Sequence, residues 1–341
     1  MSATTKVPVL VTGGGGYIGS HAVLALRDAG WDVVVLDNES NSTGVLVPQG
    51  VPYVKGSIAD RPLVASLLRE HRIGAILHFA GSILVAESVT DPLKYYDNNT
   101  LASHALLSEA VAAGVPHIVF SSTAAIYGAP ERLPIEEGDP KLPINPYGAS
   151  KWMTEQMLAD AARVHDFNYA ALRYFNVAGA DPDLRSGQIG KTSTHIVKIA
   201  TEAALGKRPH VDVFGTDYPT PDGSCIRDYI HVSDLAAAHV AALERLIEQP
   251  GENLLLNCGY GTGLSVIEVL DALDTVVQRK VPRVIGPRRP GDPPQLVASN
   301  KALTETLDWT PAHADIHQII SDALAWERKL GEGALAGDRA A

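Results

Sequence analysis

The sequence is poor in the residues on which several classes of protein depend. Only two cysteines occur among 341 residues, and the spacing of Cys225 and Cys258 fits neither a metal site nor a disulfide framework. This scarcity favours a reducing, cytoplasmic location. No run of about 18 apolar residues occurs, and the first residues lack the apolar segment of a signal peptide, so we expect no membrane span and no secretion.

An excess of basic charge is also missing. The chain has 28 Lys and Arg residues against 39 Asp and Glu residues, which gives a formal net charge of −11. An acidic chain does not suit nucleic acid or an anionic membrane as its main partner, whereas basic groups gathered in one place can still bind an anionic metabolite. The histidines are scattered without the spacing of ligands, so we predict no metal site.

The first half of the chain alternates between short runs rich in β-branched residues and amphipathic stretches. The predicted strands are residues 7–11, 32–36, 52–54, 74–79, 117–120 and 169–172. The predicted helices are residues 17–29, 62–71, 98–113 and 147–165. This alternation predicts an α/β fold with right-handed βαβ crossovers and a Rossmann-type, doubly wound, mostly parallel sheet.

The composition of the sequence changes after Tyr174, where loops rich in Gly, Pro and Asp separate shorter predicted elements. The predicted divisions are an NAD-binding Rossmann domain over residues 1–174, a smaller substrate lobe over residues 175–330 and a flexible tail over residues 331–341. Residues 234–248, as a helix, and 254–257, as a strand, are expected to return to the main sheet. The two lobes should therefore be interwoven.

A glycine-rich turn joins the first predicted strand to the first predicted helix, at residues 12–19 (TGGGGYIG). Gly13 permits a tight turn, Gly16 lets the backbone approach a pyrophosphate, and Gly19 permits close packing of the helix. Asp37 ends the second strand 18 residues after Gly19. A carboxylate there accepts hydrogen bonds from ribose hydroxyls and repels a 2′-phosphate. A glycine cluster alone can be a plain turn, but this context favours NAD over NADP.

A tyrosine and a lysine four residues apart form the second chemical signal, because Tyr147 and Lys151 share one face of a helix. A nearby ammonium and an oxidised nicotinamide ring would lower the phenol pKa from about 10 toward that of a general base. Thr123 or Ser122, after the preceding strand, would hold the substrate oxygen. The pair is common by chance and gains weight from the glycine turn before it.

Further motifs follow in a fixed order between about Val9 and about Trp326. They are Thr12–His21 (TGGGGYIGSH), Asp37-Asn38 with Asn41-Ser42, His78–Gly81 (HFAG), Tyr95–Asn99 (YYDNN), Ser121–Gly128 (SSTAAIYG), Pro146–Lys151 (PYGASK), Arg173–Ala180 (RYFNVAGA), Phe214–Val232 (FGTDYPTPDGSCIRDYIHV) and Pro287–Asp292 (PRRPGD). In these motifs the chain resembles the UDP-glucose (UDP-galactose) 4-epimerases of the extended short-chain dehydrogenase/reductase family.

The resemblance implies an isomerase of galactose metabolism that interconverts UDP-galactose and UDP-glucose. Tightly bound NAD would oxidise C4 transiently, the 4-keto sugar would rotate, and hydride would return to its opposite face. Tyr147 would take the proton of the 4-hydroxyl, Thr123 would bond that oxygen, and Lys151 would also bond the nicotinamide ribose.

The resemblance also implies the binding positions. Those for the cofactor are Gly13, Gly16, Tyr17, Ile18, Gly19, Asp37, Asn38, Asn41, Ser42, Ser57, Ile58, Phe79, Ala80, Gly81, Asn98, Ser121, Tyr147, Lys151 and Tyr174. Those for the UDP-sugar are Thr123, Tyr147, Asn176, His195, Phe214, Arg227, Tyr229, Arg289 and Asp292. His195 stands where some relatives have Asn, so it either bonds the diphosphate or is an ordinary helix residue.

Three positions depart from the family pattern. Ser57 stands where relatives often have Asp near the adenine, and Ile83 stands where some carry Lys near the cofactor. Leu296 falls where the family places a residue that bears on N-acetyl sugars, and its medium size leaves their use open.

Other functions remain as alternatives. The chain could act on UDP-xylose and UDP-arabinose or on UDP-GlcNAc and UDP-GalNAc. A dehydratase is disfavoured, because Ala124 and Ala125 follow Thr123 where such enzymes carry Asp-Glu. A net reductase would release NADH, and a non-catalytic NAD-sensing module would not need Tyr147 and Lys151.

Relatives are usually homodimers, paired through helices like those predicted at residues 98–113 and 147–165. The small residues Ala102, Ala105, Ala149 and Ala159 permit close helix contact, although a face buried within one monomer has the same pattern.

Overall fold

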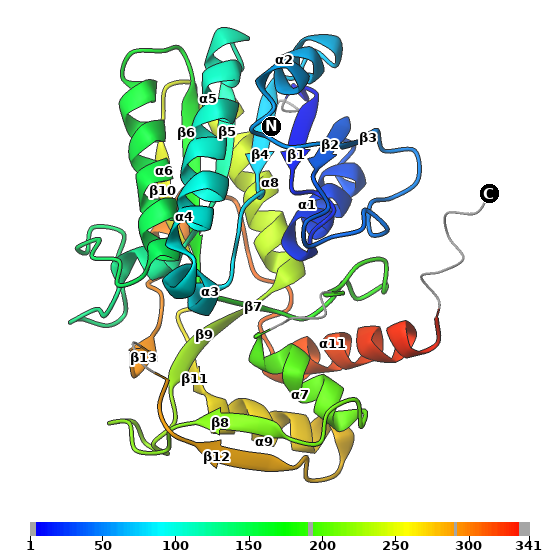
Figure 1. Ribbon diagram of the computed structural model, residues 1–341, viewed down its shortest axis with the longest axis vertical. Coiled ribbons are helices and arrows are strands. Elements are labelled where there is room, and N and C mark those ends of the chain that lie inside the picture. Colours follow the sequence, from blue (N-terminus) through cyan, green and yellow to red (C-terminus); the bar gives the residue numbers. More distant parts are fainter. Residues whose placement is uncertain (1–4, 190–193, 290–291, 334–341) are drawn as a thin grey trace.

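The computed structural model describes residues 5–189, 194–289 and 292–333 (Figure 1). Within these residues, parallel strands form a seven-stranded main sheet in the order β10-β6-β5-β4-β1-β2-β3. The strands are β1 (Val9–Thr12), β2 (Val33–Asp37), β3 (Tyr53–Lys55), β4 (Ala75–His78), β5 (His117–Thr123), β6 (Asn168–Tyr174) and β10 (Leu254–Cys258). This order confirms the predicted Rossmann fold.

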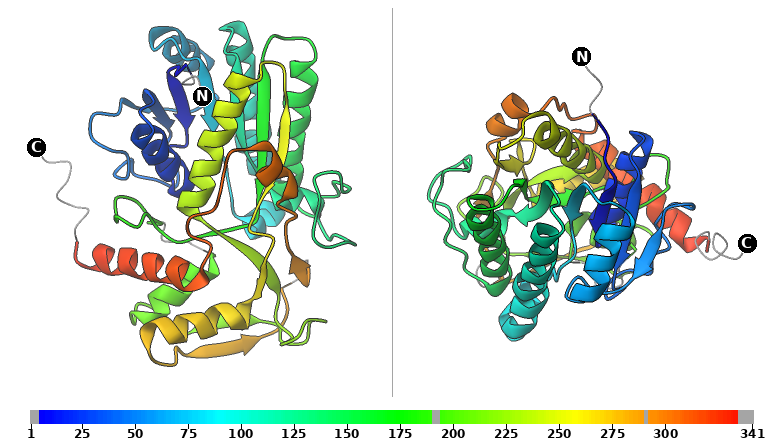
Figure 2. Two further views of the ribbon diagram at one scale, coloured as in Figure 1. Left: turned by 180° about the vertical axis from the view of Figure 1, so that it is seen from behind. Right: turned by 90° about the horizontal axis from the view of Figure 1, so that it is seen from above.

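Helices cover both faces of the main sheet. The covering helices are α1 (Tyr17–Asp28) and α8 (Val232–Glu248) on one face, and α2 (Arg61–Glu70), α5 (Ala102–Ala112) and α6 (Pro146–Ala162) on the other. Figure 2 shows α8, in yellow-green, beside α1, in blue. Because successive strand residues face opposite sides, Val9 and Val11 enter the core under α1 and α8, and Leu10 enters the core under α2, α5 and α6.

The helix predicted from residue 98 begins differently from the expectation. Two short helices, α3 (Val85–Thr90) and α4 (Pro92–Tyr95), precede it, and its first turns are a π-helix, η1 (Tyr96–Leu101). The buried Asn99 sits in this wider turn, and its side chain bonds the main chain of Ser82, as described below. Periodicity does not reveal such a local change of winding, which often accompanies a functional site.

The second lobe is made of short elements that the sequence analysis mostly did not assign. They are β7 (Asn176–Ala178), α7 (Ile196–Ala204), β8 (Val211–Phe214), β9 (Ile226–His231), β11 (Gly263–Ser265), α9 (Val266–Val277), β12 (Arg283–Gly286), β13 (Gln295–Leu296) and α11 (Ile316–Gly331). Helix α10 (Lys301–Thr306) instead packs against β10 in the core of the main sheet. Strand β9 pairs with β7, β11 and β13, and β8 pairs with β12.

The two lobes are interwoven as predicted. Strand β9 leads directly into α8, which packs on the main sheet, and β10 then pairs with β6 at the edge of that sheet. The residues at which the lobes divide stay a prediction. Helix α11 includes Gly331, so the first residue of the expected tail is helical, and residues 334–341 lie outside the described residues. None of the described helices is long and apolar enough to span a membrane.

Three histidines are buried in the core around the main sheet. Burial lowers the pKa of His78 to about 3 and the pKa values of His21 and His239 to about 4. The hydroxyl groups of Thr12 and Ser103 each lie 2.8 Å from a ring nitrogen of His78. These three rings are therefore neutral at pH 7.

We expect the buried histidines to make the protein sensitive to mild acid. Their folded pKa values lie below the ordinary 6.5, so the unfolded chain binds protons first as the pH falls below 6.5. Stability should fall between pH 6.5 and pH 4, by about 2 kcal/mol for each histidine at pH 5. Urea unfolding measured across this range would test it. His239→Gln should flatten the pH dependence, and His104→Gln, at an exposed position, should not; equal slopes in wild type and His239→Gln would contradict the expectation.

Candidate active site at the carboxyl edge of the sheet

A cavity of about 390 Å³ opens at the carboxyl ends of β1, β2, β4 and β5. The predicted cofactor residues that line it are Gly13, Gly16, Tyr17, Ile18, Gly19, Asp37, Asn38, Asn41, Ser42, Ser57, Ile58, Phe79, Ala80, Gly81, Asn98, Ser121 and Tyr174. The predicted substrate residue His195 lines it too. This is the edge at which ligands bind to open parallel sheets.

Other residues of the cavity wall were not predicted. They are Gly15, Leu36, Ser40, Gly56, Ser82, Leu84, Ala102, Gln188, Ile189 and Thr194, together with Ile83, which was noted only as a departure from the family. Most are chain neighbours of predicted residues, so a wider window around each motif would have found them. Gln188 and Ile189 come from the second lobe, and only the folded chain brings them to this cavity.

The glycine turn is as tight as its sequence predicts. Gly13 has φ +71°, and a Cβ atom there would lie 2.6 Å from the main-chain nitrogen of Ala80. A Cβ on Gly19 would lie 2.2 Å from the carbonyl oxygen of Gly13, so Gly19 makes room for the turn itself. The close packing on the sheet that was expected of Gly19 occurs at Gly14, whose Cβ would lie 2.8 Å from the side chain of Val35.

The start of α1 is suited to an anion. Its N-cap is Gly16, which has no side chain to cap the helix, and its first turn carries no acidic residue. Tyr17, Ile18 and Gly19 of this turn line the cavity. The first N–H groups of a helix have no partner within the helix and carry its positive partial charge, so this wall fits a pyrophosphate.

The carboxylate of Asp37 joins the glycine turn to the loop after β2. It accepts hydrogen bonds from the main-chain nitrogens of Gly15 (2.9 Å) and Glu39 (2.8 Å) and from the Ser42 hydroxyl (2.9 Å). Asp37 also lines the cavity. Its carboxylate is thus held in a fixed orientation at the place where a ribose would need an acceptor.

The loop that follows β4 is fastened by the π-helix. Asn99 accepts a hydrogen bond from the Ser82 nitrogen (2.7 Å) and donates to the Ser82 carbonyl (3.0 Å) and to the Ser150 hydroxyl (3.0 Å). Asn98, one residue earlier, donates to the Ser82 hydroxyl (3.1 Å) and lines the cavity. The sequence analysis singled out Asn98 alone, because only the structure shows that Asn99 ties this loop to α6.

The three predicted catalytic residues meet where β5 ends. Thr123 is the last residue of β5, and its hydroxyl hydrogen-bonds the phenol of Tyr147, the second residue of α6. The Lys151 ammonium, one helical turn further, donates to the Ser121 carbonyl (3.1 Å). Ser122 points to the other face of the sheet and donates to Glu155, so the structure favours Thr123 of the two hydroxyls considered.

Burial dominates the pKa values at this site. It raises the pKa of Tyr147 above the ordinary value of 10, against the opposing effect of the Thr123 hydrogen bond, and it lowers the pKa of Lys151 to about 8. The lowering of the phenol pKa that we expected from Lys151 is therefore not found in the chain alone, because desolvation outweighs it. Desolvation also raises the pKa of Tyr174, which is half-buried at the cavity wall, and its hydroxyl bonds that of Ser121.

Most of the remaining substrate candidates gather in the second lobe. Arg227, on β9, forms an ion pair with Asp292, and the guanidinium of Arg289 lies 3.9 Å from the centroid of the Phe214 ring. Among the described residues, these four do not line the cavity above. Each arginine is thus held by a neighbouring side chain of the second lobe.

Two candidates on paired strands differ in exposure. Asn176 begins β7 and is half-buried, opposite Tyr229 of β9. Tyr229 is only 4% exposed and lies in the hydrophobic core of the second lobe, which favours a packing role over the predicted substrate contact.

The structure also locates the three positions that depart from the family pattern. The Ser57 hydroxyl accepts a hydrogen bond from the Ala59 nitrogen (3.1 Å) at the cavity wall, and Ile83 is 50% exposed at the same wall. Leu296 pairs with Arg227 in register and packs against the apolar cluster around Ile126, just after Thr123.

The chain is similar to known proteins along most of its length. A model of the NAD dependent epimerase/dehydratase family matches residues 9–259. The chain is 55% identical to a UDP-glucose 4-epimerase of Azospirillum brasilense, over 94% of this chain and 92% of that protein. It is 46% identical to a UDP-glucose 4-epimerase of Rhizobium meliloti (strain 1021), over 95% and 98% of the two chains.

Solved structures are similar as well. UDP-glucose 4-epimerase from Brucella ovis in complex with NAD superposes with a TM-score of 0.90 at 43% identity, covering 94% of this chain and 98% of that one. The enzyme from Stenotrophomonas maltophila with bound NAD and formylated UDP-arabinopyranose gives a TM-score of 0.92 at 40% identity, covering 96% and 99%.

The glycine turn yields a test of dinucleotide binding. Gly19→Ala would press a methyl group against the Gly13 carbonyl, and overpacking of this kind costs about 1–3 kcal/mol, so we expect NAD affinity to fall about tenfold or more. The dissociation constant can be measured by calorimetry on protein stripped of NAD. Gly138→Ala, where an added Cβ meets nothing within 4 Å, is the control. Equal affinity in both variants would show that this turn does not hold the dinucleotide.

Proposed function

The chain belongs to the NAD dependent epimerase/dehydratase family, and from this membership we propose that it is a UDP-glucose 4-epimerase, which interconverts UDP-galactose and UDP-glucose. The observation that carries the proposal is the meeting of Thr123, Tyr147 and Lys151 at the end of β5. These three do not line the cavity among the described residues, but Ser121, whose carbonyl holds Lys151, does. The identity of 55% over nearly the whole chain supports it.

The described residues of the cavity fit NAD. The uncapped start of α1 suits the pyrophosphate, and the fixed carboxylate of Asp37 suits the ribose hydroxyls. When bound, NAD supplies a hydride acceptor and donor and, while oxidised, a positive charge. Because the reaction has no net change of redox state, we propose that NAD stays bound through turnover.

Tyr147 transfers the proton of the sugar 4-hydroxyl. As a phenolate, its oxygen accepts this proton and later returns it, and the Thr123 hydroxyl bonds the same sugar oxygen. Burial alone opposes a phenolate, so the phenol needs positive charge close by during turnover. Lys151, held by the Ser121 carbonyl at the same strand end, is the protein's own source of such charge.

The residues after Thr123 favour chemistry at C4 over dehydration. The helical turn η2 (Ala124–Tyr127) carries no carboxylate, and its first two residues are alanines. A dehydratase needs an acid and a base there to act on C5 and C6. With Thr123 and Tyr147 as the groups at the strand end, proton transfer is confined to the 4-oxygen.

The second lobe is proposed to bind the UDP part of the substrate. Arg227 and Arg289 supply the local positive charge that an acidic chain needs for a diphosphate. Phe214 and Asp292, which contact these arginines, and Asn176 are proposed to bound the same site.

The assignment of Tyr147 can be tested directly. Tyr147→Phe removes the general base, so kcat for conversion of UDP-galactose to UDP-glucose should fall by about 10²-fold or more. The assay, with product followed by NMR, needs no added NAD in wild type. Tyr169→Phe, a core tyrosine near the opposite end of β6, is the control. An unchanged rate in Tyr147→Phe would reject the role, and a stoichiometric need for added NAD would reject a retained cofactor.

We also propose that the protein is a cytoplasmic homodimer. Large apolar side chains stay exposed over elements that contact one another, namely Val89 of α3, Leu93 of α4, Leu101 of η1 and Met153 of α6. An exposed apolar surface that runs over neighbouring helices suits a second copy of the chain.

Two of the four alanines considered earlier serve this surface less well. Ala102 is buried and lines the cavity, and Ala159 packs in the core beneath α6. The larger exposed residues are therefore better candidates for the contact between two copies.

Association can be tested by placing a charge in this surface. Leu101→Glu should convert the dimer into a monomer, because a carboxylate would have to be buried without a partner on association. Light scattering after gel filtration measures the mass. Ile285→Glu, an equally exposed apolar position on β12 in the second lobe, should leave the dimer intact. A wild-type protein that is already monomeric would end the proposal.

A further inference from the structure

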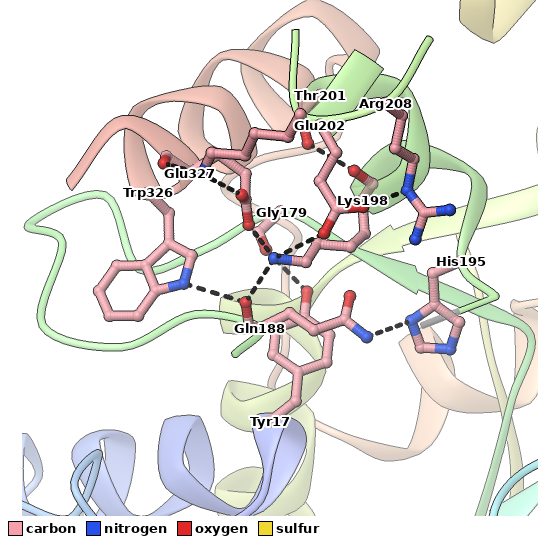
Figure 3. A network of polar contacts seen from close by, with 11 residues as sticks. Tyr17, Gly179, Gln188, His195, Lys198, Thr201, Glu202, Arg208, Trp326 and Glu327 are labelled. Carbon is pink, nitrogen blue, oxygen red and sulfur yellow. Dashed lines mark hydrogen bonds and ion pairs between the residues drawn. The ribbon is translucent and has the colours of Figure 1, made fainter. Parts of the chain in front are cut away.

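The segment before α7 contributes a histidine to the cavity wall and a glutamine that bonds it. His195, the N-cap residue of α7, lines the cavity beside Tyr17 of α1, with 6.4 Å between the ring centroids. The side-chain amide nitrogen of Gln188 lies 3.2 Å from Nδ1 of His195 (Figure 3). Gln188 lines the same cavity.

This contact selects one tautomer of the imidazole ring. An amide nitrogen only donates, so Nδ1 of His195 accepts and carries no proton. Burial lowers the pKa of His195, which keeps the ring neutral near pH 7. A neutral ring that accepts at Nδ1 carries its proton on Nε2, and it donates from there.

Gln188 is itself held from two helices. Its main-chain carbonyl oxygen accepts hydrogen bonds from the Lys198 ammonium of α7 (3.1 Å) and from the indole nitrogen of Trp326 of α11 (3.2 Å). The residue before it is glycine, and a Cβ on Gly187 would lie 2.5 Å from the Trp326 ring. The indole therefore packs directly on the main chain of this segment.

The lysine that holds Gln188 lies within a cluster of charges around the buried Glu327. Lys198 pairs with Glu327 and, at 3.5 Å, with Glu202, and Lys207 pairs with Glu327 at 2.9 Å. Figure 3 shows the Lys198 ammonium beside Glu202, Glu327 and Gln188. Helices α7 and α11 thus fix the main chain of Gln188, a residue that lines the cavity.

We propose that Gln188 is a positioning residue that holds His195 in the tautomer donating from Nε2 to a phosphoryl oxygen of a bound nucleotide, and that Lys198 and Trp326 hold Gln188 for this task. The proposal rests on the proposed function for the nature of the ligand. The oxygen belongs either to the diphosphate of the UDP-sugar or to the pyrophosphate of NAD, whose site at the start of α1 includes Tyr17.

The test uses full-length protein with its retained NAD and UDP as the probe. Gln188→Met keeps the length of the side chain but removes the amide donor. We expect the dissociation constant for UDP and the KM for UDP-galactose to rise about five- to tenfold, with kcat changed less than about twofold, as for a lost hydrogen bond to an anion. Calorimetry measures UDP binding, and absorbance measures the NAD content.

The chain offers a matched control. Gln318 bonds Nδ1 of His313 at 2.8 Å in the same manner, and neither residue lines the cavity among the described residues. Gln318→Met should leave UDP binding and NAD content unchanged. Trp326→Phe, which removes the indole donor and part of the ring that packs on Gly187, should weaken binding in the same direction as Gln188→Met by at least about two- to threefold.

A double-mutant cycle shows whether Gln188 acts through the imidazole. His195→Asn supplies an amide donor that has no tautomers, so in this background Gln188→Met should change UDP and NAD binding less than about twofold. A purely structural role of Gln188 would persist in the double variant.

The outcomes separate the two sources of the oxygen and the two proposals. Weaker UDP binding with full NAD content assigns the oxygen to the UDP-sugar, and loss of NAD with normal UDP binding assigns it to the dinucleotide. Wild-type binding of both in Gln188→Met, or an equal effect of this change in the His195→Asn background, overturns the inference. A wild type that binds UDP but does not epimerise UDP-galactose refutes the proposed function and leaves this test standing.

Discussion

Parallel pairing of the strands in the main sheet is the constraint on which the rest of the site depends. Because every strand runs in the same direction, the glycine turn after β1, Asp37 at the end of β2 and Thr123 at the end of β5 all reach one edge. Helices on both faces leave this edge as the place where polar groups can meet a ligand. The cavity, the carboxylate and the tyrosine are neighbours for this reason.

Side chains without a proposed catalytic role hold the loops and the helix at this edge in position. Asn99, in the widened π-helical turn, fixes the loop after β4 and reaches Ser150 of α6. Further along α6, Glu155 accepts hydrogen bonds from Ser122 of β5 and from the buried Arg173 of β6. Helix α6 is thus tied both to the π-helix and to the sheet, and this fixes the positions of its Tyr147 and Lys151.

The features that could be predicted from the sequence are those that depend on residues close together in the chain. Strand periodicity, the tight turn at Gly13 and the carboxylate of Asp37 depend on neighbours in sequence, and the structure contains each of them. The π-helix, the short strands of the second lobe and the place of Gln188 depend on contacts between distant segments, which periodicity does not reveal. The phenol pKa was expected to fall because the charge of Lys151 was considered without the burial of both groups.

The indole of Trp326 rests on Gly187 and bonds the carbonyl of Gln188, although 138 positions separate that carbonyl from the tryptophan. During synthesis on the ribosome, β1 to β6 can pair long before this tryptophan has been made. The wall formed by Gln188 is set only when α11 has emerged. A nascent chain therefore carries the sheet and the glycine turn for some time before its binding cleft is complete.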